Sequence, residues 1–293
     1  MIDKLEMFVE LARARHFGRA SLAVGVTQPT LSSAIMQLED TLGVPLVLRG
    51  SRFQGLTPEG EAVLIRARAI LAEVRALKDE ARSSRQNLSG RIRLGVIPTA
   101  LPMVAELVAP LTARHPGITV TILSRSAAEI AAGIDRFDLD AGITYAETVP
   151  PRHTAVPLYD ERLCLLMSAG HPLAQTGRAG WSDIADFPLC LLSGEMQNRR
   201  IVEERLLAAG VRAQPQVDSN SILAIIGHVR TGKWLSVVPE RLVRTLLDDT
   251  LRMRPLPGPG TPVILVAAAR EPRAAPVQAL LAEARRSTLA RAG

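Results

Sequence analysis

The sequence predicts an α/β protein in which three successive segments differ in their hydrophobic pattern. Residues 1–57 have the pattern of short helices separated by turns, residues 58–89 that of one long helix, and residues 90–293 that of apolar strands alternating with helices. The length of 293 residues is enough for two or three folding units. Hydrophobic residues make up 47% of the chain but aromatic residues only 3%, so the cores must be built mainly from Ala, Leu, Val and Ile.

The C-terminal segment supplies most of the predicted elements. Strands are expected at 91–97, 118–123, 139–144, 164–168, 188–192, 235–238 and 263–268, and helices at 101–114, 127–135, 198–209, 221–231, 239–247 and 275–286. Apolar strands that alternate with helices indicate mainly parallel sheets covered on both faces. Gly90 is expected just past the end of the long helix that precedes them.

Composition and motifs exclude several classes of protein. No apolar run approaches the ~20 residues of a membrane span, and the N-terminus lacks the apolar stretch of a signal peptide, so we expect a cytoplasmic protein without a membrane partner. Common enzyme motifs are absent, and the five histidines lack metal-ligand spacing, so we expect no catalytic residue, metal or cofactor. The net charge of +6 is compatible with a nucleic-acid partner, but residues 1–89 have 12 basic and 10 acidic side chains and contribute only +2.

The two cysteines, Cys164 and Cys190, both lie in apolar runs and form no CxxC motif. This setting favours inert buried thiols, because a free cysteine often behaves as a small buried hydrophobic residue. A redox switch is the alternative role for them.

Residues 19–43 have the pattern of a helix-turn-helix. A short helix over 19–24 is followed by Gly25, where a tight turn between helices requires a positive φ. Thr27 is placed to cap the second helix, and Pro29 suits its first turn. One face of this second helix is apolar at spacings of four, three and four: Leu31, Ile35, Leu38 and Leu42.

The opposite, polar face of the second helix suits the major groove of DNA, which such a helix enters by its N-terminus. An ordinary helical hairpin with a polar outer face is the alternative. The side chains expected to contact DNA are Gln28, Pro29, Thr30, Ser32, Ser33 and Gln37.

The next residues favour the DNA-binding interpretation, because 46–56 has the pattern of two short strands around a Gly/Ser turn. Two strands in this position predict the wing of a winged helix-turn-helix. Arg49 and Arg52 flank the turn, where they are placed to meet phosphates or the minor groove. Solvated surface charges are the alternative role for these two arginines.

The long helix carries a heptad seam. If it runs from Pro58 to about residue 88, it is about 45 Å long at 1.5 Å per residue. A lone helix cannot bury such a stripe, so we expect a second copy of the chain to pack against it, which would let two winged domains read two half-sites. Packing against the chain's own domain is the alternative. The seam residues, spaced alternately by four and three, are Val63, Ala67, Ile70, Val74, Leu77 and Ala81.

The chain resembles the LysR-type transcriptional regulators. The resemblance lies in LEMFVELARARHF at 5–17, GVTQPTLSSAIMQLEDTLGVPLVLR at 25–49 and LTPEG at 56–60, and continues over the whole length. It implies a sequence-specific regulator controlled by a small-molecule effector. The implied partners are double-stranded promoter DNA, RNA polymerase, and further copies of the chain in a homodimer or a tetramer made of two dimers. Ser33 stands where many members carry Arg, so the base contact at this position departs from the family pattern.

The resemblance also implies that residues 90–293 form two lobes like those of type 2 periplasmic binding proteins. Lobe I would contain about 90–160 plus 265–293, and lobe II about 161–264. Such lobes bind an effector between them, at strand ends and helix N-termini. The residues at the corresponding positions are Pro98, Thr99, Ala100, Ser124, Ser126, Thr144, Tyr145, Gln197, Asn198, Arg199, Ser219, Asn220 and Ser221.

The chemistry of the effector is suggested by Arg199 and Arg200, next to Gln197 and Asn198. A charged fork beside a cleft predicts a small anion, such as formate or another carboxylate. Helix capping is the alternative role for each Ser and Thr of the set. Two alternative functions also remain open: a thiol-redox regulator of the same fold, and a ligand-binding protein without a DNA function.

Overall fold

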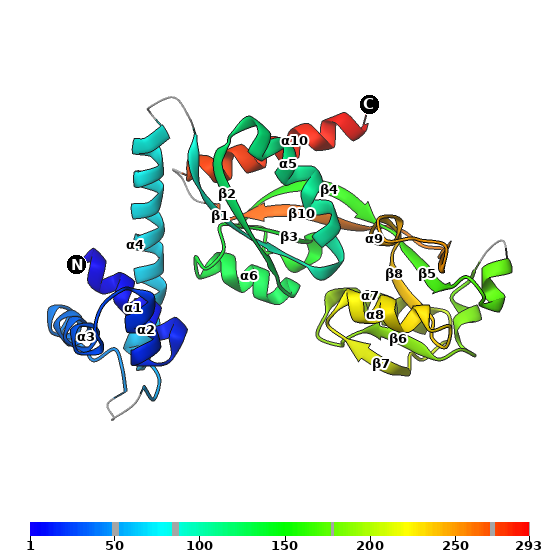
Figure 1. Ribbon diagram of the computed structural model, residues 1–293, viewed down its shortest axis with the longest axis horizontal. Helices are drawn as coiled ribbons and strands as arrows, with labels where there is room; N and C mark the ends of the chain where they lie inside the picture. Colours follow the sequence, from blue (N-terminus) through cyan, green and yellow to red (C-terminus); the bar gives the residue numbers. More distant parts are fainter. Residues whose placement is uncertain (49–52, 84–87, 177–178, 270–272, 293) are drawn as a thin grey trace. The chain divides into compact units, whose positions relative to one another are not determined.

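The computed structural model describes residues 1–48, 53–83, 88–176, 179–269 and 273–292. The chain divides into two compact units, one containing helices α1–α4 and the other the elements from β1 to α10 (Figure 1). None of the helices in the described part of the chain combines the length and the apolar character needed to span a membrane.

The first unit is a winged helix-turn-helix with a long fourth helix. Its helices are α1 (Ile2–Ala14), α2 (Phe17–Ala23), α3 (Gln28–Leu42) and α4 (Pro58–Ser83). Their apolar faces meet in one core, which includes Phe8, Leu11, Leu31, Leu38, Leu46 and Leu64. The second helix of the predicted helix-turn-helix is confirmed as α3: Thr27 Oγ1 accepts a hydrogen bond from Thr30 N over 3.3 Å, and the helix ends at Gly43 with a φ of 73°.

The wing is described only at its base. Val47 and Leu56 form an antiparallel bridge, and Leu48 N donates to Gly55 O over 3.0 Å. Glu39 of α3 holds this base in place, since its Oε1 accepts hydrogen bonds from Leu46 N (2.7 Å) and Val47 N (3.1 Å). The predicted tip, with Arg49 and Arg52, lies outside the described residues.

The second unit contains two α/β lobes. In the first lobe β1 (Ser89–Val96), β2 (Gly117–Ser124), β3 (Ala141–Tyr145), β4 (Thr154–Glu161) and β10 (Thr261–Ala267) form a sheet in the order β2-β1-β3-β10-β4. The helical elements of this lobe are η1 (Pro98–Met103), α5 (Val104–Arg114), α6 (Ala127–Asp135), η2 (Ala146–Thr148) and α10 (Ala275–Ala292). Figure 1 shows α5 and α10 on one face of the sheet and α6 on the other.

The second lobe is built around two smaller sheets. One has the order β8-β5-β9, with β8 (Ser236–Pro239), β5 (Leu163–Ser168) and β9 (Leu251–Pro255), and the other pairs β6 (Leu189–Leu192) with β7 (Pro215–Ser219). Its helical elements are η3 (Pro172–Gln175), η4 (Ser182–Ile184), α7 (Gln197–Ala208), α8 (Ile222–Arg230) and α9 (Glu240–Arg244). Two apolar cores lie on the faces of these sheets.

Several expected features differ in the structure. The sheets are mixed, because β10 runs antiparallel to β3 and β4, and β5 runs antiparallel to β8 and β9. Strands β4, β7 and β9 were not predicted, since proline and charged residues interrupt their apolar pattern. Gly90 does not end the long helix: it lies inside β1 with a φ of 150°.

Candidate DNA-binding face and effector pocket

The outer face of α3 is the candidate DNA-binding face, and the structure leaves it in solvent. Leu31, Ala34, Ile35 and Leu38 are buried on the inner side. All the predicted contact residues of this helix lie outside that core: Gln28, Pro29, Thr30 and Gln37 are exposed, and Ser32 and Ser33 are half-buried.

Two local hydrogen bonds order the side chains of this face. The hydroxyls of Thr27 and Thr30 are 2.8 Å apart, and Gln37 Nε2 donates to Ser33 Oγ over 3.4 Å. Both pairs present hydroxyl and amide groups that can accept or donate to base edges. Met36 lies on the same face and was not predicted, although its position three residues after Ser33 indicates that the two side chains share a face of the helix.

The candidate effector pocket is a small hollow, with room for about one water-sized molecule, between the two lobes of the second unit. Its lining contains six of the predicted effector residues: Pro98, Thr99, Ser126, Tyr145, Gln197 and Asn198. Ile97, Ala127, Leu192 and Met196 supply the rest of the wall. The remaining predicted residues are not in this lining: Ala100, Ser124, Thr144, Arg199, Ser219, Asn220 and Ser221.

Tyr145 is the centre of the polar contacts at this pocket. Its hydroxyl lies 3.3 Å from Thr99 Oγ1, accepts a hydrogen bond from Asn198 Nδ2 over 3.4 Å, and donates to Glu161 Oε1 over 2.5 Å. Thr99, Tyr145 and Glu161 belong to the first lobe, whereas Asn198 lies in the first turn of α7 in the second. The hydroxyl group therefore joins the lobes at the ligand site.

Glu161, which accepts the hydrogen bond of Tyr145, was not among the residues predicted from the sequence. It is the last residue of β4, at the point where the chain crosses into the second lobe, and it is buried. Burial raises the pKa of its carboxyl group to about 7, against the hydrogen bonds from Tyr145, Thr99 and Asn198, which lower it. Burial also raises the pKa of Tyr145 well above its usual value, and the nearby Glu161 adds to the rise.

The structure does not place Arg199 as a charged fork in the pocket. Its Nη1 donates to Leu192 O over 2.9 Å, and its Nε donates to Glu203 Oε1 over 2.8 Å. The guanidinium is thus engaged within its own lobe. Three residues of the lining are each bonded to a carboxylate: Gln197 to Glu147, Ser126 to Glu129 and Tyr145 to Glu161. Arg199 therefore does not supply the positive charge from which the small anion was predicted.

Two further contacts join the lobes away from Tyr145. Gln197 Nε2 donates to Glu147 Oε1 over 2.7 Å. On α9, the guanidinium of Arg241 donates to Glu106 Oε2 over 2.8 Å and lies 4.9 Å from the centre of the Tyr159 ring. These contacts lie outside the described core clusters and can break at low cost when the lobes move.

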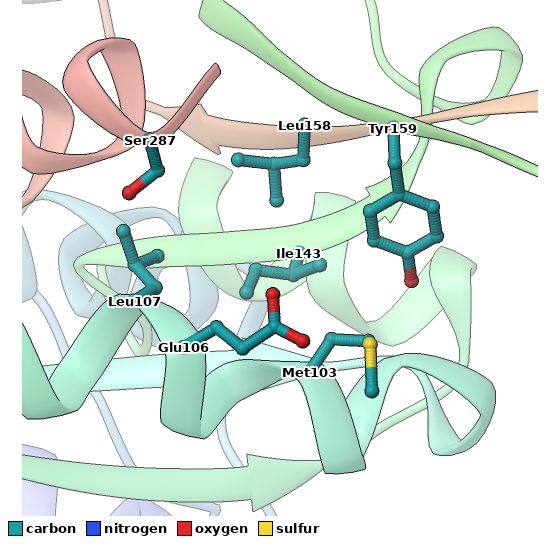
Figure 2. A pocket seen from close by; sticks show the side chains of 7 residues that line it. All are labelled: Met103, Glu106, Leu107, Ile143, Leu158, Tyr159 and Ser287. Atoms are coloured by element: carbon teal, nitrogen blue, oxygen red, sulfur yellow. The ribbon is translucent and has the colours of Figure 1, made fainter. Parts of the chain in front are cut away.

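A second hollow, of about 350 Å³, lies beside the Arg241 contact. Figure 2 shows Leu107, Ile143 and Leu158 gathered on one side of it, with Tyr159, Met103 and the carboxylate of Glu106 on the other. Its wall is mostly apolar, and its one carboxylate is already held by Arg241. The hollow therefore offers no polar cluster comparable with the one around Tyr145.

Residues 2–61 match the family model "Bacterial regulatory helix-turn-helix protein, lysR family", and residues 85–288 match the model "LysR substrate binding domain". The chain belongs to the LysR family of bacterial transcriptional regulators. It is therefore a DNA-binding regulator and not an enzyme, as the sequence predicts.

Several relatives of this LysR-family chain are named for peroxide response. A "Probable hydrogen peroxide-inducible genes activator" of Mycobacterium avium is 34% identical over 83% of this chain and 78% of the relative. The "DNA-binding transcriptional dual regulator OxyR" of Escherichia coli K12 is 30% identical over 83% of this chain and 80% of the relative. A cysteine-to-aspartate variant of full-length OxyR from Pseudomonas aeruginosa has a TM-score of 0.76 and 26% identity, covering 97% of each chain.

The cysteines of this LysR-family chain are both buried in one apolar core of the second lobe. Burial raises the pKa of the Cys164 thiol, and it raises that of Cys190 to about 11. Residues 235–239 lie between them, because Cys164 pairs with Val238 and Cys190 N donates to Leu235 O. Two strands with a third strand between them lie about 9–10 Å apart, whereas the Cα atoms of a disulfide are only ~4.4–6.8 Å apart.

The long helix of this regulator does not present the whole predicted seam. Ala67 is buried in the core of its own unit, together with Leu64 and Leu71, so this part of the stripe packs against the chain itself. Farther along α4 the side chains of Ile70 and Leu77 are 44% and 66% exposed, and Val74 is half-buried. Val63 packs against the unit's own core, and Ala81 is exposed.

Proposed function

We propose that this LysR-family regulator binds promoter DNA through the outer face of α3 and changes its DNA binding when a small polar molecule occupies the pocket at Tyr145. The observation that carries the proposal is the hydrogen-bonded group of Thr99, Tyr145, Glu161 and Asn198, which draws on both lobes. A ligand that replaces one of these bonds alters how the lobes are held together. It can shift the regulator only by the difference in its affinity for the two arrangements.

The chemistry of the pocket favours an uncharged ligand that both donates and accepts hydrogen bonds. Thr99, Tyr145 and Asn198 supply hydroxyl and amide groups, and Glu161 Oε2 is buried without a hydrogen-bond partner among the described residues. An anion would lie close to the Glu161 carboxyl, and none of the described residues that line the pocket is a lysine or an arginine. We therefore propose an uncharged polar effector in place of the small anion expected from the sequence.

The proposal includes the assembly that the family resemblance implies. Ile70, Val74 and Leu77 on the distal half of α4 provide the dimer contact, and a dimer places two copies of α3 on two half-sites. Two such dimers associate into a tetramer. The arrangement of the dimers, which the lobes control, then determines the contact with RNA polymerase.

The ligand half of the proposal is tested with full-length protein bound to its own upstream DNA. Fluorescence anisotropy, footprinting and thermal shift are measured with a panel of small polar molecules, including alcohols, amides and carboxylates. Asn198→Ala is expected to abolish the response to an active molecule while DNA binding persists. Asn220→Ala is the matched control, because Asn220 is exposed and is not in the pocket lining. A response that survives Asn198→Ala and Thr99→Val would contradict the proposed site.

The DNA half is tested by substitutions on α3 and the wing. Gln28→Ala and Thr30→Ala are expected to relax sequence preference, each costing about 1–3 kcal/mol at one base pair. Arg49→Ala is expected to weaken binding to every sequence. It should also reduce by about 1 the slope of the logarithm of the binding constant against the logarithm of the salt concentration. Unchanged non-specific binding by Arg49→Ala would remove the wing from the interface.

A second candidate function, a peroxide-responsive regulator, is favoured by the names of the relatives. The burial and the raised pKa of both thiols oppose rapid oxidation, because only the thiolate is nucleophilic enough to attack the O–O bond of peroxide. Footprints with and without hydrogen peroxide separate the two candidates. A peroxide response that disappears in Cys164→Ser or Cys190→Ser would establish thiol sensing, and an unchanged footprint would leave the ligand-controlled regulator.

A further inference from the structure

The helix proposed to enter the major groove contains no basic residue. From Gln28 to Leu42, α3 has neither Lys nor Arg, and its charged residues are Glu39 and Asp40. Glu39 is turned to the wing, where it accepts hydrogen bonds from Leu46 N and Val47 N. Guanine is most often read by Arg or Lys, so this helix must read bases through uncharged polar groups and apolar contacts.

Met36 is a long apolar side chain on the mostly polar outer face of α3. Its side chain is 56% exposed, and among the described residues it is not one of those that pack against the core of its unit. It follows Ser32 and Ser33 by four and three residues, so these three side chains share one face of the helix. The buried positions Leu31 and Ile35 lie on the other side.

The only apolar group that a base pair presents in the major groove is the 5-methyl group of thymine. Ser32 and Ser33 are short, so the helix backbone can come close to the groove floor at this point. Met36 has a long, flexible and polarisable side chain, which can reach a methyl group over the serines. Contact with DNA would cover the apolar surface that Met36 exposes in the free protein.

We propose that Met36 is a specificity-determining residue that contacts the 5-methyl group of a thymine in each half-site. This inference rests on the proposed function, which places the outer face of α3 in the major groove. The Met36 contact adds a requirement for thymine at one position, next to the bases read by Gln28 and Thr30.

The test begins with selection of bound sequences from a random duplex library by full-length protein. Each thymine of the selected half-site is then replaced singly by deoxyuridine, which removes one methyl group and leaves every hydrogen bond of the base pair. The wild-type protein is expected to lose about four-fold in affinity at one thymine, the change that corresponds to one buried methyl group. The T-to-U ratio at that position is expected to fall to about one in Met36→Ser.

The matched control is Leu22→Ser, since Leu22 is an apolar side chain on α2 that is 82% exposed. This variant is expected to keep the four-fold sensitivity. Deoxyuridine sensitivity that persists in Met36→Ser, or that is absent at every thymine while specific binding remains, overturns the Met36 inference and leaves the DNA-binding proposal intact. Failure to select any sequence overturns both.

Discussion

The Tyr145 hydroxyl donates a hydrogen bond of 2.5 Å to Glu161 Oε1, at the point where β4 leaves the first lobe. The two residues are 16 apart in the chain. Asn198, in the first turn of the second lobe's α7, donates to the same hydroxyl. The Tyr145 hydroxyl thus links the two lobes at the proposed effector pocket.

Tyr145→Phe is expected to reduce the free energy of unfolding by about 1–3 kcal/mol, because it leaves a buried carboxyl oxygen without its donor. Denaturant unfolding of the full-length protein, followed by circular dichroism, measures the change. Combining the substitution with Glu161→Leu should recover part of the loss, since both partners of the bond are then apolar. A single-variant loss below about 0.5 kcal/mol would show that the bond does not hold the site together.

The pH dependence of stability should report Glu161. Its pKa is raised from 4.5 to about 7 in the folded protein, so between these values the folded state keeps a proton that the unfolded chain releases. The contribution of this group to stability therefore falls as the pH rises through that window and is lost above it. Relative to Glu161→Gln, the wild type should lose roughly 3 kcal/mol between pH 4.5 and pH 8, at 1.36 kcal/mol per pKa unit. Parallel pH profiles of the two proteins would contradict this prediction.

Gly60→Ala is expected to destabilise the first unit by several kcal/mol and to abolish DNA binding. A Cβ atom at Gly60 would lie 2.0 Å from the carbonyl oxygen of Leu46, which belongs to the backbone at the base of the wing. Thermal unfolding and anisotropy with DNA measure the two effects. Gly227→Ala is the matched control within helix α8: its Cβ would meet nothing within 4 Å, so we expect no loss, or a gain of up to about 1 kcal/mol.

Leu77→Glu is expected to weaken self-association by at least ten-fold, because it places a charge on the exposed apolar stripe of α4. Sedimentation velocity over a range of concentrations measures the effect. Leu207→Glu, on the outer side of α7 with 64% exposure, is the matched control and should leave the oligomer unchanged. An unchanged sedimentation coefficient for Leu77→Glu would place the dimer contact elsewhere.

Cys164 and Cys190 are expected to react slowly with a thiol reagent in the native protein and rapidly after unfolding, because both thiols are buried and their pKa values are raised. Time courses with Ellman's reagent, with and without denaturant, measure the ratio of the rates. A native rate within ten-fold of the unfolded rate would reveal an accessible thiolate and would favour peroxide sensing.

The winged helix-turn-helix could be predicted because its determinants are local. Thr27, Pro29 and Gly43 specify the start and end of α3, and the spacing of its leucines specifies the buried face. The strands with uninterrupted apolar runs were found for the same reason. Strand β4 was not predicted, because Pro157 and the charged residues at its end interrupt the apolar alternation of a strand. Its pairing with β10 is visible only in the structure.

The sequence was enough to predict helix α3 and its buried face, since helix caps and periodic apolar faces depend on neighbours within a few positions. The resemblance to the LysR family predicted the class of protein and six residues that line one pocket between the lobes. Only the tertiary structure decided that Glu161 lies beside Tyr145 and that Arg199 turns away to Glu203. It also decided that Ala67 packs into its own unit. The burial of a carboxyl group and the partner of a guanidinium depend on contacts between segments that are distant in the chain. Such contacts produce no periodic pattern in the sequence, so they cannot be predicted from it.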